Sequence, residues 1–243
     1  MINDLMLLAG NDIPFTAAQV TIHQPTIKEI GYIGEESFFT GVEYLKFSKD
    51  ILSEEDRINL EIYTDFDILM SMIKQKNIEV QKIKIGMEMV LSLIFPEYQI
   101  ILNDVILLKK GQEEHIINNQ NFEEFKSIIT KMFSLDKNDG ENTEYNPGGK
   151  LARQIAEKLK KRRQQLAENK PPQKIAVFNR YVSILSVGLQ KDMNSLMNYT
   201  VYQLFDEFTR YELKVGYDMY IQAKMAGAKD LKEVEDWMKD LHP

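Results

Sequence analysis

Cysteine is absent from this 243-residue chain, and histidine is scarce. Without a thiol there is no disulfide framework, no cysteine nucleophile and no cysteine-ligated metal site, which fits a reducing compartment. The three histidines, His23, His115 and His242, lie far apart, with no carboxylate at a metal-ligand spacing. A site built from all three stays open, although surface or turn histidines are the simpler interpretation.

Long apolar runs are also missing. The run at 5–9 follows Asp4 and has no basic residue before it, unlike a signal peptide. The longest run elsewhere, at 89–95, is far shorter than the roughly 20 residues that span a bilayer. We therefore expect no targeting segment, no membrane contact and a location in the cytoplasm.

Known catalytic motifs are missing as well. Residues 148–150 are similar to part of a phosphate-binding loop, but Glu144 replaces a required glycine and Leu151 a required serine or threonine. Residues 136–140 are similar to the start of a calcium loop, but Pro147 stands where that loop needs a glutamate. A pair of carboxylates of the glycosidase type stays open. Our expectation is a protein without catalytic residues, cofactor, metal or enzymatic activity.

The composition is that of a globular protein, with 44% hydrophobic and 28% charged residues. Its net charge of −7 is unevenly distributed along the chain. Residues 1–149 carry 25 acidic and 13 basic side chains, whereas residues 150–174 carry 2 acidic and 9 basic ones. One short basic segment therefore interrupts an acidic chain.

The basic segment also has apolar residues at helical spacing, which predicts a helix. Three interpretations are open: a solvated face that pairs with the chain's own acidic part, contact with an acidic protein surface, or nucleic-acid binding. No aromatic residue lies between Tyr145 and Phe178 to stack on bases, which disfavours nucleic acid. The candidate partner contacts here are Lys158, Lys160, Lys161, Arg162 and Arg163.

Helical patterns dominate the first part of the chain. Thr26 and Glu29 form a capping box at a helix start, and Asn121 is a candidate cap for a helix over 122–133. Residues 98–117 instead predict two strands about a turn at 103–104 and a third short strand at 115–117. The predicted class is α+β, predominantly α-helical, with a small antiparallel β-hairpin in the middle of the chain.

Residues 135–149 are polar and contain three glycines and a proline, which is typical of a linker. We therefore expect a mixed helical domain at 1–134, with the hairpin near 98–117, and a helical domain at 150–243. The second domain would begin with the basic helix.

The C-terminal part is densely apolar. Residues 175–189 are hydrophobic on nearly every side, which predicts a buried helix. Residues 200–226 predict an amphipathic helix that ends at Gly227, followed by a short helix from Asp230 to Trp237. The apolar stripe of the amphipathic helix comprises Val201, Leu204, Phe205, Phe208, Tyr211, Val215 and Met219.

Three tyrosines, Tyr202, Tyr217 and Tyr220, lie beside this stripe and exceed what one helical face can bury. Tyrosine is favoured at interfaces because it combines an apolar body with a polar tip. These residues are therefore candidate partner contacts, and the alternative is that they belong to the core.

Residues 198–240, NYTVYQLFDEFTRYELKVGYDMYIQAKMAGAKDLKEVEDWMKD, include a threonine-led helix, a Tyr-Gln-Leu core and a final Asp-Trp-Met. This stretch resembles the C-terminal part of small proteins encoded in the tail gene clusters of phages and prophages of Gram-positive bacteria. Those proteins are described as tail assembly chaperones or related tail and baseplate assembly factors. HQPTIKEI, near the N-terminus, is similar to the opening common in such proteins.

This resemblance implies a protein that works by binding, without cofactor, in the cytoplasm of a bacterial host or within the virion. Its helical surfaces would hold other tail or baseplate proteins, such as a tape-measure protein, and self-association is a further option. The alternatives are a structural subunit that stays in the particle and a nucleic-acid-binding protein that uses the basic helix at 150–174.

Overall fold

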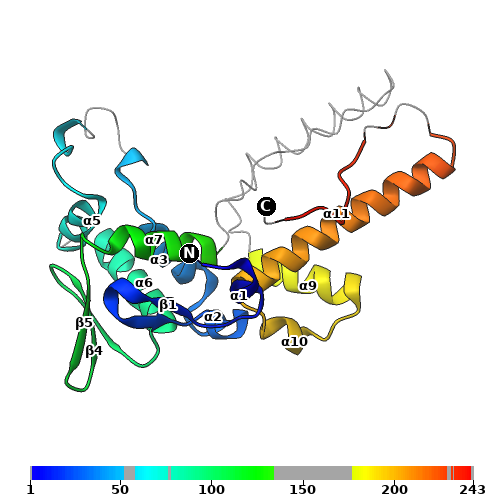
Figure 1. Cartoon of the computed structure of the whole chain (residues 1–243). Coiled ribbons are helices and arrows are strands. Elements are labelled where there is room, and N and C mark those ends of the chain that lie inside the picture. Colours follow the sequence, from blue (N-terminus) through cyan, green and yellow to red (C-terminus); the bar gives the residue numbers. More distant parts are fainter. Residues whose placement is uncertain are drawn as a thin grey trace.

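The computed structural model describes residues 2–51, 58–75, 78–133, 177–228, 231 and 233–241. Most of these residues are helical, and two small antiparallel sheets lie among the helices (Figure 1). The predicted α+β class with a helical majority is confirmed.

The first elements of the chain are a short helix and a two-stranded antiparallel sheet. Ile13 pairs with Ile22 and Phe15 with Val20, and these four side chains are buried. The sequence patterns did not predict this sheet, because strands of three residues are too short to show a clear alternation. The elements are α1 (Asp4–Leu8), β1 (Ile13–Phe15), η1 (Thr16–Ala18) and β2 (Val20–Ile22).

The capping box at Thr26 is confirmed. The Glu29 amide donates to Thr26 Oγ1 at 3.2 Å, and Glu29 Oε2 accepts from the Thr26 amide at 2.7 Å. This arrangement satisfies donors that have no partner within the helix. Helix α2 (Ile27–Ile33) follows, and Gly34 turns the chain with a φ of +83° into α3 (Glu35–Leu45).

Helices α3 and α6 (Ile78–Ile94) approach each other closely because glycines face each other where they cross. A Cβ atom placed on Gly41 would lie 2.3 Å from the carbonyl oxygen of Gly86 and 2.6 Å from Val90 Cγ2. Only glycine, which has no Cβ atom, fits at position 41, so the backbones of α3 and α6 are in direct contact where the helices cross.

Helix α5 (Asp65–Ile73) is joined to α7 (Phe122–Met132) by a largely buried ion pair. Lys126 Nζ donates to Asp65 Oδ2 at 2.7 Å, and the Lys49 amide donates to Asp65 Oδ1 at 3.1 Å. Burial raises the pKa of the Asp65 carboxyl, but these hydrogen bonds outweigh it, and the pKa lies below its ordinary value. The 3₁₀ helix η2 (Lys49–Ile51) contributes the second donor.

The expected side-chain cap at Asn121 is wrong. Asn121 Oδ1 accepts from the Asn118 amide at 2.8 Å, and Nδ2 donates to the Ile116 carbonyl at 3.0 Å. The side chain thus closes the turn between the sheet and α7, and it makes no capping bond to the first turn of α7. The Asn121 side chain therefore bonds to the backbone of preceding residues instead of capping the helix.

The predicted strands at 98–117 are confirmed as a three-stranded antiparallel sheet with the order β3-β4-β5. Ile100 pairs with Leu108, and Leu108 pairs with His115. His115 Nδ1 lies 3.0 Å from the Ala18 carbonyl oxygen, which ties the sheet to η1. The strands are β3 (Gln99–Leu102), β4 (Ile106–Lys110) and β5 (Glu113–Ile117).

Three helices form the C-terminal part: α9 (Val177–Leu189), α10 (Met193–Met197) and α11 (Val201–Met225). The helix predicted at 175–189 forms as α9, but the expectation that it is buried holds for only one of its faces. One face of α9, with Phe178, Tyr181 and Leu185, is buried, whereas Val187 is exposed. The described part of the chain offers neighbours for only one side of this helix.

The N-terminal and C-terminal elements share one hydrophobic core. The Phe38 ring on α3 lies 5.0 Å from the Phe133 ring and 5.7 Å from the Phe178 ring, measured between centroids. Glu35 Oε1 accepts from the Phe178 amide at 2.9 Å, near the beginning of α9. The expected linker at 135–149 lies outside the described residues, and the described elements on either side of it pack together.

The short helix expected from Asp230 to Trp237 is absent from the described residues there, 231 and 233–237. We call residues 231 and 233–241 the C-terminal segment. It has no regular secondary structure apart from turns, and it returns beside α11. Gly227 ends α11 as predicted, with a φ of +84°.

Candidate interaction surface

Helix α11 is anchored at its beginning by the N-terminal part of the chain. Thr200 caps it together with Gln203, and Thr200 also forms an antiparallel bridge with Thr26. The Ile27 amide donates to the Tyr199 carbonyl at 2.9 Å, and Gln203 Nε2 donates to the Leu8 carbonyl at 2.7 Å. These bonds fix the direction in which α11 leaves the core.

The proximal half of α11, which we define as residues 201–211, packs against α9. The Tyr181 ring stacks on the Phe208 ring, with centroids 3.6 Å apart and planes at 5°. The Tyr211 ring lies against the bare backbone of Gly188, where an added Cβ would be 2.2 Å from the Tyr211 hydroxyl oxygen. Aromatic stacking and a glycine notch thus hold the two helices together.

An ion pair supports the same half of the helix. Lys191 Nζ donates to Glu207 Oε1 at 2.8 Å and to the Tyr199 hydroxyl at 2.9 Å. Burial lowers the pKa of Lys191, but these hydrogen bonds outweigh it, and the pKa lies above its ordinary value. The loop between α9 and α10 is thereby tied to α11.

The distal half of α11, residues 212–225, continues past this support. Figure 1 shows α9 beside the first part of α11 and the end of α11 extending beyond it. Met219, the last member of the predicted apolar stripe, is 65% exposed, and Met225 is also exposed. The apolar stripe therefore continues along α11 beyond the hydrophobic core.

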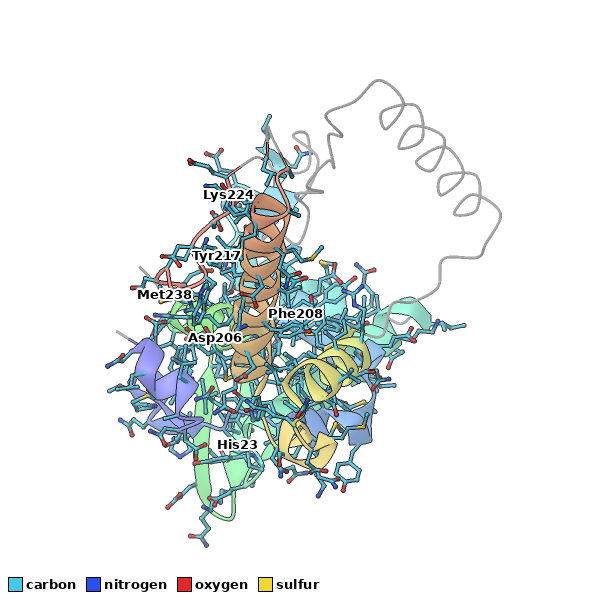
Figure 2. All side chains as sticks on the ribbon, turned by 90° about the vertical axis from the view of Figure 1, so that its right-hand side faces the viewer. His23, Asp206, Phe208, Tyr217, Lys224 and Met238 are labelled. Atoms are coloured by element: carbon cyan, nitrogen blue, oxygen red, sulfur yellow. The ribbon has the colours of Figure 1, made fainter. Side chains whose placement is uncertain are left out.

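The C-terminal segment returns along another side of α11. Arg210 Nη1 donates to the Trp237 carbonyl at 2.5 Å and to the Lys239 carbonyl at 2.7 Å. In Figure 2, Tyr217 and Met238 lie on the side of α11 along which this segment returns, and Phe208 lies on the other side. Tyr217 and Phe208 are nine residues apart, which places them on opposite helix faces.

One of the three candidate tyrosines does not lie on this surface. Tyr202 is only 3% exposed, and its hydroxyl donates to Asp4 Oδ1 at 3.1 Å. Burial and the adjacent Asp4 carboxylate raise the pKa of the Tyr202 phenol. The expectation that Tyr202 lies on an open flank is wrong, because α1 packs over the beginning of α11 and supplies a partner for its hydroxyl group.

Tyr217 and Tyr220 are half-buried on the distal half, and Lys224 Nζ lies 5.6 Å from the centroid of the Tyr220 ring. The five basic candidates lie outside the described residues. Sequence reasoning missed the contribution of the C-terminal segment, although its apolar residues at helical spacing were a signal of an interacting element. The basic candidates are Lys158, Lys160, Lys161, Arg162 and Arg163.

The part of the chain that the structure describes contains no group of three or more metal-ligating side chains placed to hold a metal ion. Within the same residues, no helix has both the length and the apolar character needed to cross a membrane.

The model of a protein family described as the YomV second domain matches residues 169–242. The matched range contains α9, α10, α11 and the C-terminal segment, and residues 1–168 lie outside it. This match indicates a phage-related protein. No curated protein and no solved structure matches the chain.

Proposed function

We propose that the chain is a non-enzymatic phage tail or baseplate assembly factor that binds other tail proteins, such as a tape-measure protein. The distal half of α11 is the binding surface in this proposal. The protein would act in the cytoplasm of the bacterial host, where tails assemble. The match to a phage-related domain and the resemblance of residues 198–240 to tail assembly chaperones support this choice.

The observation that carries the proposal is the extension of α11 beyond the core. Residues 212–225 add about four helical turns. Most helical stability in proteins comes from packing of an apolar face, yet Met219 and Met225 remain exposed in this extension. A helix with flexible methionines and tyrosines on its surface is well suited to cover apolar helices of a partner.

Coproduction of the chain with each tail protein of the same gene cluster tests the proposal. Tyr217→Ala and Tyr220→Ala should each weaken a complex by about 2 kcal/mol, roughly 30-fold in Kd, if these side chains are interface anchors. Binding can be measured by titration calorimetry on purified complexes.

Tyr32→Ala is the matched control, because Tyr32 is 82% exposed on α2, and α2 lies away from the distal half of α11 (Figure 1). It should leave binding unchanged. If no tail protein binds, or if the control weakens binding as much as the α11 variants do, the proposed function or its surface is wrong.

A further inference from the structure

The C-terminal segment has the sequence pattern of a helix that the structure does not form. At about 100° per residue, its five apolar residues would share an arc of about 120°. All of the charged residues between 231 and 241 would occupy the remaining side, with four carboxylates and two lysines. The apolar residues are Leu231, Val234, Trp237, Met238 and Leu241.

In the structure this separation is lost, and much of the apolar surface is exposed. Met238 is 68% exposed, Val234 is also exposed, and Leu241 is buried. The Lys239 amide donates to the Asp236 carbonyl at 3.1 Å, so a single turn is closed. A helix of about eleven residues is marginal without an apolar surface to pack on. The segment therefore has the pattern of a helix and lacks the surface that would stabilise it.

The Arg210 contacts are also incompatible with a helix over this segment. Arg210 Nη1 donates to both the Trp237 and the Lys239 carbonyl groups, which are two residues apart in the chain. In a helix, carbonyl groups two residues apart point about 200° apart around the axis, so one nitrogen atom could not bond to both. The two carbonyl bonds to Arg210 and a helical segment are thus mutually exclusive.

We propose that the C-terminal segment is a docking helix that Arg210 holds in a non-helical form along α11. It becomes helical when its apolar face enters an apolar groove on a tail protein. Lysine or arginine side chains around that groove complement its acidic face. This inference rests on the proposed function for the identity of the partner, and its conformational part is independent of that identity.

The conformational part is tested by NMR on the full chain. Backbone chemical shifts of residues 231–241 are followed as trifluoroethanol, which favours helices, is added to the wild type and to Arg210→Gln. The variant should become helical at a lower concentration, because the bonds that oppose the helix are gone. Equal midpoints, or no helix in either protein, would overturn the inference.

The docking part is tested with the tail proteins of the same gene cluster. Arg210→Gln should bind about three- to tenfold more tightly, because a larger fraction of molecules is competent to bind. Met238→Asp should bind at least about tenfold more weakly. Met193→Asp is the matched control, since Met193 is exposed in the first position of α10, where a carboxylate is tolerated. Glu233→Lys should also weaken binding if the groove is surrounded by basic side chains.

The outcomes distinguish this inference from the proposed function. If a tail protein binds the wild type and Met238→Asp equally, the docking helix is wrong and the assembly role stands. If neither the wild type nor Arg210→Gln binds any tail protein, the assembly role fails and the partner proposed here fails with it. The NMR comparison then still decides whether the segment can change conformation.

Discussion

The two halves of α11 form one continuous helix and have different surroundings. The proximal half has α9 on one side and α1 at its beginning, and Leu204 and Phe208 are buried. The distal half has similar apolar spacing, but the core does not reach it, and Met219 stays exposed. Local sequence is sufficient to continue a helix, whereas burial depends on which other elements arrive beside it. The same apolar pattern can therefore stabilise the fold in one half and be available for a partner in the other.

The largest expected difference between the halves concerns their apolar side chains. Phe208→Ala should lower the free energy of unfolding by about 3–5 kcal/mol, because it removes the ring stacked on Tyr181 and leaves a cavity. Met219→Ala, on the same stripe, should change it by less than about 0.5 kcal/mol. Urea unfolding followed by circular dichroism measures both. Equal losses would show that the distal half is also packed.

A pair of glycines should give effects of opposite sign. Gly188→Ala places a methyl group against the Tyr211 ring and should destabilise the protein by about 1–3 kcal/mol. Gly216→Ala meets nothing within 4 Å and should stabilise it by about 0.5–1 kcal/mol, since alanine favours a helix. Thermal unfolding of the two variants checks the signs. A stabilising Gly188→Ala would mean that α9 and α11 separate easily.

Removal of tyrosine hydroxyl groups should give a smaller difference in unfolding free energy between the two halves of α11. Tyr202→Phe removes the hydrogen bond to Asp4 and should cost about 1 kcal/mol of unfolding free energy. Tyr217→Phe, in the distal half, should cost less than about 0.5 kcal/mol. Denaturant unfolding at neutral pH measures the difference. A larger loss for Tyr217→Phe would place its hydroxyl group in a stabilising bond.

The smallest expected effect is a loss of stability at alkaline pH that depends on Tyr202. The pKa of Tyr202 is raised in the folded protein, because burial and the Asp4 carboxylate favour the neutral phenol. The stabilisation is therefore complete below the unfolded-state pKa of about 10 and is lost as pH rises through the higher folded-state pKa. Unfolding measured between neutral pH and the alkaline range should show a steeper loss for the wild type than for Tyr202→Phe. Parallel curves would contradict a buried neutral phenol.

Much of the fold follows from local signals. The Thr26–Glu29 capping box, the strands around residues 103–104 and the end of α11 at Gly227 were predictable, because each depends on a few neighbouring residues. The candidate site was predictable only in part. Tyr217 and Tyr220 lie half-buried on the distal half, but Tyr202 is covered by α1, nearly two hundred residues away in sequence.

By itself, the sequence determined where several of the helices begin or end, which class of fold results and which helix faces are apolar. Only the tertiary structure decided which of those faces are covered. Tyr202 is buried and Met219 is exposed on one helix because α1 and α9 both reach only its first half. The C-terminal segment has an amphipathic pattern, but it forms no helix, and Arg210 binds two of its carbonyl groups. Periodicity is a local property of the chain, and burial is a property of the neighbours that folding brings to it.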